Sequence, residues 1–307
     1  MGLDMGAPGI YLAIGASCTL ALALVWPVEA ERPPPSSASP FWPGLALILS
    51  GLVIAALTAD HFLARYVVLE MVAFCTLLAF LIEGPLVRQK FPLWRRYFCF
   101  RIGDVGLISA ILLLWRFSET FSIKEMLAAA LLLAPGYQLL IALGVVLAVW
   151  VKMGLPPFHA WLLDSSLLSW EKRTWLTGAG LPVLGAYLLY RFNALIGSLA
   201  LFRIALNVGG MLVLLWLVLK QRRSDWLYER SLFWLIGHGS VGFLLVGTSL
   251  MRPYLLTFLP LRMAICVVAA ARQPSADLAA TGWEDHTIPI EPQGWLLGGA
   301  RWAAFLE

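Results

Sequence analysis

A lysine interrupts a long apolar run near the middle of this 307-residue chain. Lys152 follows an unbroken run of apolar and glycine residues, and Pro156 and Pro157 come shortly after it. Proline has no backbone N–H to donate, so the pair breaks any helix through this point. A charged side chain in an apolar membrane layer costs about 2.5–3.5 kcal/mol on insertion scales and is a functional-site candidate. The spacing predicts an ionisable centre beside a helix break. Alternatively, Lys152 ends its helix and extends its amine to the membrane surface.

The chemistry that such a lysine supports is proton transfer. Desolvation penalises its ammonium form, whereas a neighbouring carboxylate stabilises that form. Moving or shielding the carboxylate would switch the lysine between holding and releasing a proton. A broken helix also frees backbone carbonyls and admits water at the same depth.

Other ionisable residues lie in or beside apolar runs and are candidates for the same pathway. Glu70 lies close to the start of its run, where an interfacial position is the alternative to a buried role. Arg101 and Asp104 are three residues apart and share a helix face, so they can neutralise each other and merely staple two helices. His159 and Asp164 follow the break and either relay protons or serve capping and packing.

Two further ionisable residues occupy the last apolar runs. His238 lies in the middle of the run 231–250, where it either carries protons or hydrogen-bonds a neighbouring helix. Arg262 stands alone in LPLRMAICVVAAA. It needs a partner from another helix, a lipid headgroup or another subunit.

The composition indicates that membrane helices position these residues. Hydrophobic residues make up 60% of the chain and charged residues 13%, whereas soluble domains are typically about 25% charged. The mean hydropathy of +0.81 excludes an ordinary globular protein. Four dispersed cysteines without CxxC spacing indicate neither disulfides nor a metal site. The net charge of +4 forms no basic block with interleaved aromatics, so nucleic acid is not an expected partner.

The hydropathy pattern predicts an all-α, polytopic transmembrane bundle of about nine spans, with one broken helix near 152–157. Each span is close to the ~20 residues that cross a bilayer. The piece 122–136 is too short to span and is expected to be interfacial or re-entrant. The predicted spans are 9–26, 41–58, 66–83, 97–116, 136–153, 174–192, 203–220, 231–250 and 254–271.

Three regions follow from this pattern. Residues 1–40 comprise the first span and a linker, EAERPPPSSASP, whose prolines and serines predict irregular structure. Residues 41–272 form the main bundle. Residues 273–307 form a polar tail ending in WLLGGARWAAFLE, which predicts a short amphipathic helix on the membrane surface or a partner; a frayed tail is the alternative.

Loop charges predict the orientation of the bundle. If the amino terminus is outside, the inner loops hold about twice as many Lys and Arg residues as the outer loops. The loops 84–96 and 220–230 then face the cytoplasm, together with the carboxyl terminus. The expected location is a bacterial cytoplasmic membrane.

Lys152 and the following MGLPPFHAWLLDS resemble the broken-helix motif of antiporter-like proton-pumping subunits. Such subunits occur in respiratory complex I, in Mrp-type antiporters and in inorganic-carbon-accumulating DAB complexes. RYVVLEMVAFCTLL at 65–78 and FRIGDVGLI at 100–108 match the family in order, and the resemblance covers about residues 45–250. It implies that Glu70 and Lys152 form one functional pair, in contact or bridged by water.

The chain also departs from the family pattern. Relatives commonly carry a histidine where ungapped counting places Thr177, and LLSWEKR replaces a PTPVSA-like segment. The family's second, inverted repeat has its own broken helix and lysine. Here the first repeat is complete and the second is expected to be truncated, with His238 as the only obvious polar substitute.

Two classes of function follow. In the first, the chain is a proton- or ion-translocating membrane subunit of a larger complex. In the second, it is a non-conducting family member that scaffolds or docks other subunits. No P-loop, GxGxxG, HExxH or nucleophile elbow is present, so neither a cofactor nor a catalytic site of its own is expected. The expected partners are the bilayer and other subunits of an oxidoreductase-like or inorganic-carbon uptake complex, and the sequence identifies neither the complex nor the ion.

Overall fold

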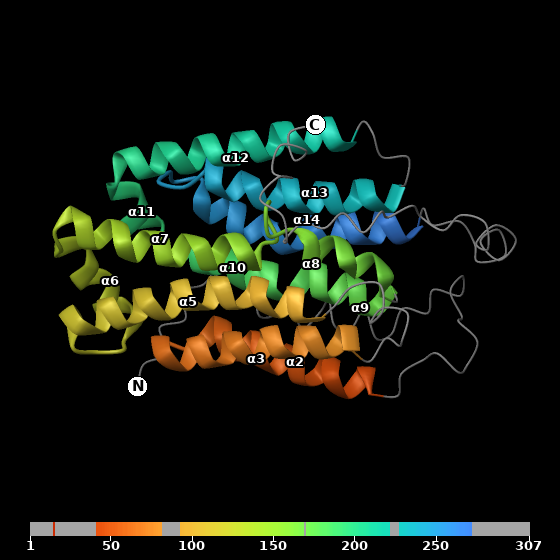
Figure 1. Cartoon of the computed structure of the whole chain (residues 1–307), viewed down its shortest axis with the longest axis horizontal. Coiled ribbons are helices and arrows are strands. Elements are labelled where there is room, and N and C mark those ends of the chain that lie inside the picture. The colour runs from red at the N-terminus through yellow and green to blue at the C-terminus, as the bar shows by residue number, and fades with distance from the viewer. Residues whose placement is uncertain (1–14, 16–40, 82–92, 169, 222–226, 272–307) are drawn as a thin grey trace, which may run out of the picture. The chain divides into compact units, whose positions relative to one another are not determined.

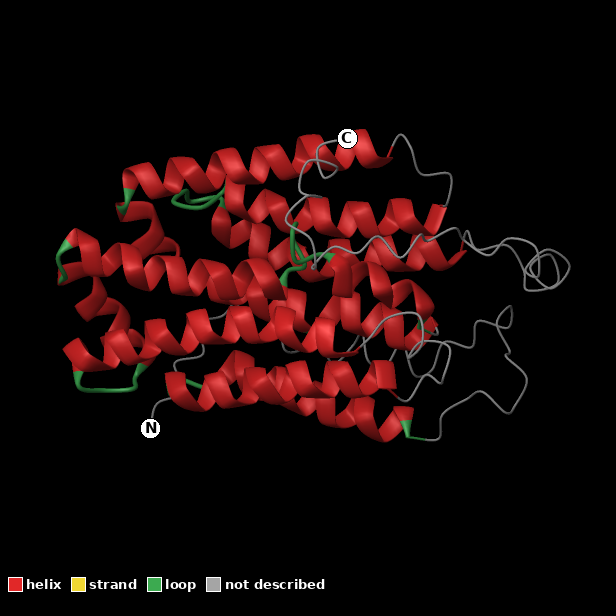
Figure 2. Ribbon diagram, in the orientation of Figure 1, coloured by secondary structure: helices red, strands yellow, loops and turns green. Residues whose placement is uncertain are grey.

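The computed structural model describes residues 15, 41–81, 93–168, 170–221 and 227–271. Within them every regular element is a helix, and one isolated bridge joins His61 to Ser122 (Figure 2). The predicted all-α fold is confirmed. The predicted span 9–26, the linker and the tail lie outside the described residues, except for Gly15, which is helical.

The first half of the bundle consists of long helices joined by short connections. In chain order they are α2 (Trp42–Thr58), α3 (Phe62–Leu81), α5 (Leu93–Ser118), the short α6 (Ile123–Leu132) and α7 (Pro135–Lys152). The long helices lie side by side along a common direction (Figure 1). The predicted short piece at 122–136 corresponds to α6, which connects α5 to α7.

The second half begins with a series of short elements and returns to long helices. The short elements are α8 (Ala160–Leu163), the 3-10 turn η2 (Asp164–Leu167), α9 (Trp170–Thr174), the π-helical turn η3 (Trp175–Ala179), α10 (Leu181–Arg191) and α11 (Asn193–Ser198). The long helices are α12 (Ala200–Gln221), α13 (Leu227–Leu244) and α14 (Met251–Ala271).

Four of the described helices are long and apolar enough to cross a membrane: Phe62–Leu81, Trp94–Ser118, Pro135–Lys152 and Ala200–Gln221. Two shorter apolar helices are Trp42–Thr58 and Leu232–Leu244. In α12 only 22% of the apolar window is buried within the chain. Its exposed leucine, valine and methionine side chains therefore suit contact with lipid.

Helices α5 and α7 pack against each other most extensively. Gly106 and Gly144 face each other at this contact, and a Cβ added to Gly106 would lie 2.8 Å from the carbonyl oxygen of Gly144. Small residues let two membrane helices approach closely, which increases van der Waals contact. On either side of this pair, α3 packs on α5, and α10 packs on α7 and α14.

The predicted helix break is present. Helix α7 ends at Lys152, and the next helical residue is Ala160. Gly154 takes a positive φ of 66°, a conformation that glycine adopts without a Cβ clash. The prolines at 156 and 157 then prevent the helix from resuming at once. The end of α7 is therefore fixed by local sequence.

The structure also differs from the predicted spans. Helix α3 begins four residues before the predicted span, which places Glu70 near the middle of its helix rather than at the start. Arg65 and Arg96, both assigned to loops from the sequence, lie within α3 and α5 and are buried. The predicted span 174–192 contains the π-helical turn η3, which the hydropathy pattern did not reveal.

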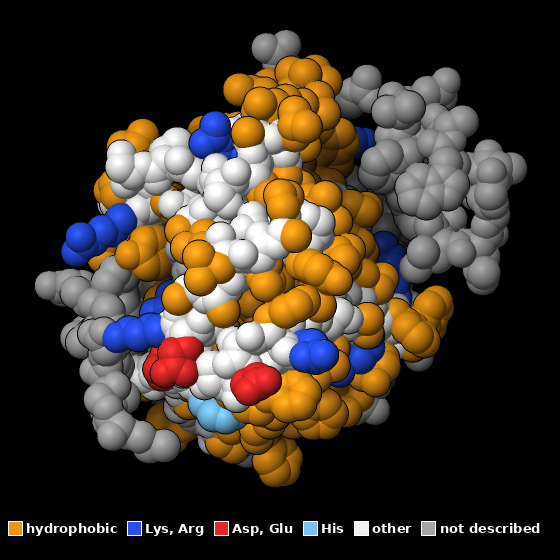
Figure 3. Space-filling view, turned by 90° about the vertical axis from the view of Figure 1, so that its left-hand side faces the viewer, with side chains coloured by type: hydrophobic (Ala, Val, Ile, Leu, Met, Phe, Trp, Pro, Cys, Tyr) orange, Lys and Arg blue, Asp and Glu red, His pale blue; other side chains and the backbone are white. Residues whose placement is uncertain are grey.

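One end of the bundle carries exposed charges. This end holds α6 and the connection between α2 and α3 (Figure 1), and charged side chains of both signs lie there beside apolar ones (Figure 3). Asp60, His61, Lys124 and Glu125 are among the exposed residues of these elements. Such a face suits a membrane–water boundary.

An ionisable centre at the helix break

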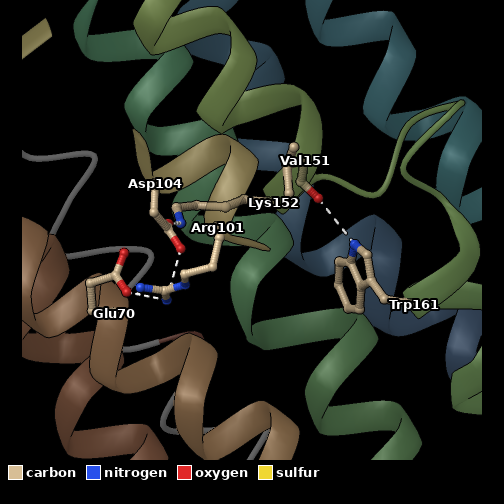
Figure 4. A network of polar contacts seen from close by, with 6 residues as sticks. All are labelled: Glu70, Arg101, Asp104, Val151, Lys152 and Trp161. Carbon is tan, nitrogen blue, oxygen red and sulfur yellow. Dashed lines mark hydrogen bonds and ion pairs between the residues drawn. The ribbon is translucent and has the colours of Figure 1, made fainter. Parts of the chain in front are cut away.

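Lys152, the last residue of α7, is paired with Asp104 on α5. Its Nζ donates to Asp104 Oδ1 at 2.7 Å, and the two side chains are 1% and 2% exposed (Figure 4). The amine of Lys152 is therefore buried against α5 rather than exposed on the surface of the bundle. Two opposite charges in contact offset part of each other's desolvation cost.

Arg101 extends this pair toward α3. Its guanidinium lies 2.9 Å from Asp104 Oδ2 and also forms an ion pair with Glu70 (Figure 4). Two bases and two acids thus form a continuous chain of ion pairs, in the order Lys152, Asp104, Arg101, Glu70. The outer end is more open, since the Glu70 and Arg101 side chains are 19% and 34% exposed.

The direct partner of Lys152 is Asp104 rather than Glu70. Among the described residues, Glu70 and Lys152 share no hydrogen bond or ion pair, and Arg101 and Asp104 lie between them. The predicted contact between Arg101 and Asp104 on one face of α5 is present. It belongs to a larger network that joins α3, α5 and α7.

A second buried ion pair lies on the far side of the break. Arg96 Nε of α5 donates to Asp164 Oδ2 of η2 at 2.9 Å. Between the two pairs, Trp161 Nε1 donates to the carbonyl oxygen of Val151 at 3.0 Å (Figure 4). Neither Arg96 nor Trp161 was predicted from the sequence as a site residue. The spacing of Arg96 could have indicated its role, because it lies about two helical turns before Asp104 and so on the same face of α5.

The two predicted histidines have aromatic surroundings. His159 meets the Trp216 ring edge-on at 5.2 Å between centroids, and His238 stacks on Phe258 at 4.7 Å. The Nδ1 atoms of both rings have no hydrogen-bond partner among the described residues. No described contact joins either ring to Lys152, so the structure does not bring them into the ion-pair chain.

Arg262 finds its partners on other helices of the same chain. Its Nε and Nη2 donate to the carbonyl oxygen of Thr177 at 2.9 and 2.7 Å, and Nη1 donates to the carbonyl of Leu235 at 2.8 Å. The side chain is fully buried. Of the predicted alternatives, the partner from another helix is the one observed. The backbone carbonyl of Thr177, in the turn η3, thus accepts two hydrogen bonds from α14.

No cluster of three His, Cys, Asp or Glu side chains suited to hold a metal occurs in the described part of the chain. The cysteines seen there, Cys75, Cys99 and Cys266, are free thiols.

Comparison with known proteins identifies the family. Residues 59–216, just over half of the chain, match the transmembrane family described as NADH:quinone oxidoreductase/Mrp antiporter. The chain belongs to this family. The matched segment contains Glu70, Arg101, Asp104 and Lys152, whereas His238 lies beyond it. Family membership and the apolar helices make the chain an integral membrane protein.

Curated relatives of this antiporter-family chain include proteins named as chains of NAD(P)H-quinone oxidoreductase. It is 26% identical over 255 residues to NAD(P)H-quinone oxidoreductase chain 4 1 of Thermosynechococcus vestitus, covering 81% of this chain and 46% of the relative. It is also 26% identical over 250 residues to chain 4 2 of Synechococcus elongatus, covering 80% and 45%. The chain therefore spans about half the length of the curated relatives that it matches.

Solved structures share the fold at low sequence identity. The Mrp complex from Dietzia sp. DQ12-45-1b matches 86% of this chain and 29% of its own, with a TM-score of 0.76 and 19% identity. Respiratory complex I from Thermus thermophilus matches 84% and 56%, with a TM-score of 0.64 and 20% identity. An archaeal membrane-bound sulfane sulfur reductase matches 85% and 55%, with a TM-score of 0.68 and 14% identity.

Proposed function

We propose that this chain is a proton-translocating membrane subunit of a hetero-oligomeric complex. Lys152 is the proton carrier, and Asp104, Arg101 and Glu70 control its charge. The observation that carries this proposal is the buried ion pair between Lys152 and Asp104 at the point where α7 ends. Membrane transporters typically form their ion and substrate sites at discontinuous helices of this kind.

Each member of the ion-pair chain has a distinct role in this proposal. Arginine stays protonated in proteins, so Arg101 acts as a fixed positive charge rather than as a carrier. Asp104 faces two cations, Lys152 and Arg101. When Arg101 moves toward Glu70, Asp104 is left to stabilise the Lys152 ammonium, and when Arg101 moves toward Asp104, that stabilisation weakens. Movement of one arginine thereby favours proton uptake or release at Lys152.

The partners and orientation belong to the same proposal. Relatives and fold neighbours bear the names of multi-subunit oxidoreductases and of an Mrp complex, which supports a hetero-complex in the bilayer. The excess of Lys and Arg in the predicted inner loops supports a cytoplasmic carboxyl terminus in a bacterial cytoplasmic membrane.

Proton flux through reconstituted vesicles tests the proposal. The full chain, with any subunits that co-purify, is placed in vesicles that contain a pH-sensitive dye, and a potassium gradient with valinomycin supplies the potential. Lys152→Met should reduce the initial flux at least tenfold while the protein elutes as before on size exclusion. The matched control is Lys124→Met, because Lys124 is an exposed lysine on α6.

A scaffold role is the second candidate. It is favoured by the balanced charges of the ion-pair chain, which hold α3, α5 and α7 together without any need for transport. Under this alternative, Lys152→Met lowers thermal stability or subunit retention and leaves the flux at the level of the unmodified protein.

A further inference from the structure

One stripe of α5 contacts the broken helix on both sides of its break. Arg96, Phe100 and Asp104 are spaced by four residues and therefore share one face of α5. Asp104 binds Lys152 just before the break, and Arg96 binds Asp164 beyond it. The two ion pairs have opposite polarity, since α5 supplies the acid to one and the base to the other.

Phe100, in the middle of the stripe, contacts the short helix that follows the break. The Phe100 ring meets the Trp161 ring of α8 at 5.5 Å between centroids, in an edge-on arrangement. Trp161 in turn donates to the carbonyl oxygen of Val151, in the last turn of α7. A single indole therefore joins α5, α7 and α8, and both Phe100 and Trp161 are buried.

Arg96 is itself held in place. Its guanidinium lies over the Phe80 ring of α3, 4.3 Å from the ring centroid, and only 2% of the side chain is exposed. A desolvated guanidinium packed between an aromatic ring and a carboxylate has little freedom to move. The Arg96–Asp164 pair thus provides a rigid attachment for the segment after the break.

We propose that Arg96, Phe100 and Asp104 form a splint across the helix break, and that Arg96 and Asp164 are positioning residues for Lys152. The seven residues after Lys152 include a glycine at positive φ and two prolines, and they are not α-helical. Helical backbone hydrogen bonds therefore cannot fix α7 and α8 relative to each other. The side chains of α5 supply this fixation, and they set the separation between Lys152 and the segment that follows it.

Charge exchange tests the splint, which rests on the proposed proton flux for its functional readout. Arg96→Met and Asp164→Asn should each lower the vesicle flux at least fivefold. The exchanged pair Arg96→Asp with Asp164→Arg should recover flux to within about threefold of the unmodified protein, since the attraction is restored. Arg95→Met, at the neighbouring position, should leave the flux unchanged. Normal flux in both single variants, or a folded exchanged pair without recovery, overturns the proposal.

A covalent bridge separates this proposal from the proposed function. Arg96→Cys with Asp164→Cys is prepared in a chain whose four native cysteines are replaced by alanine, and a short bifunctional thiol reagent then joins the pair. Efficient bridging supports the contact whether or not protons move, and absence of bridging in a folded protein contradicts it. Recovery of flux on bridging supports positioning. If Lys152→Met leaves flux intact while bridging succeeds, proton translocation fails and the splint remains as architecture.

Discussion

Asp104 on α5 accepts a hydrogen bond from Lys152 on α7 at 2.7 Å, in a site almost closed to solvent. The carboxylate is shared, because its second oxygen lies 2.9 Å from Arg101. Removal of Asp104 would therefore leave two cations without their common anion. Removal of Glu70, at the more exposed end of the same chain of ion pairs, would leave Asp104 in place.

We expect Asp104→Asn to be much more damaging than Glu70→Gln. Breaking a buried ion pair by removing one partner typically costs about 3–5 kcal/mol, because the remaining charge is stranded. Asp104→Asn should lower the thermal midpoint in detergent and abolish vesicle flux. Glu70→Gln should slow the flux without eliminating it. Equal flux in the two variants would contradict the proposal that Asp104 matters more than Glu70 for the charge of Lys152.

The contact between Gly106 and Gly144 allows a second prediction. A methyl group at Gly144 would collide with the backbone of Gly106, so Gly144→Ala must push α5 and α7 apart. Overpacking of this kind costs about 1–3 kcal/mol. We expect a lower thermal midpoint together with reduced flux, since Asp104 and Lys152 lie on these two helices.

Gly136→Ala is the matched control on the same helix. A Cβ at Gly136 meets open space, and alanine favours a helix over glycine. Its thermal midpoint should be unchanged or slightly higher. A similar loss of stability in both variants would mean that the close approach of α5 and α7 is not the cause.

Arg262 should be required for stability despite its buried charge. Thr177 lies in a π-helical turn, and the residue five positions later is Pro182, which has no N–H to offer its carbonyl. Arg262→Met would leave the Thr177 carbonyl without its donors, at about 1–3 kcal/mol for a buried unsatisfied group, whereas the Leu235 carbonyl would lose only an additional donor because it lies inside α13. We expect a lower thermal midpoint.

Arg262→Lys should restore only part of this stability, because one ammonium does not reproduce the fork of donors on a guanidinium. Arg252→Met is the control, since Arg252 is exposed on the same helix. Full stability in Arg262→Met would show that relief of the buried charge outweighs the lost hydrogen bonds.

Cysteine labelling tests the orientation. The helix ends that flank residues 82–92 and 222–226 lie at the same end of the bundle, opposite α6 (Figure 1). In a background without native cysteines, Gln89→Cys and Ser224→Cys should not react with an impermeant maleimide on intact cells. Lys124→Cys, on α6, should react. The reverse pattern would invert the proposed topology.

Several features of this protein are determined by local sequence. The apolar composition requires helices, because a bilayer offers no hydrogen bonds to an unpaired backbone. Pro156 and Pro157 determine the break, and Lys152 is recognisable beside it since it is the only charge in that run. The predicted helix ends were less accurate. Arg65 and Arg96 were placed in loops although they are buried within helices, because a buried arginine lowers the local hydropathy as a loop charge does.

The partner of Lys152 was decided only by the tertiary structure. Glu70 and Asp104 are both acids in apolar helices, and the sequence does not say which of them faces α7. The rotation of α5 about its axis decides this, and it is fixed by the contact of Gly106 with Gly144 and by the stripe Arg96, Phe100 and Asp104. Such a rotation depends on packing between residues distant in sequence, and hydrophobic periodicity does not record it.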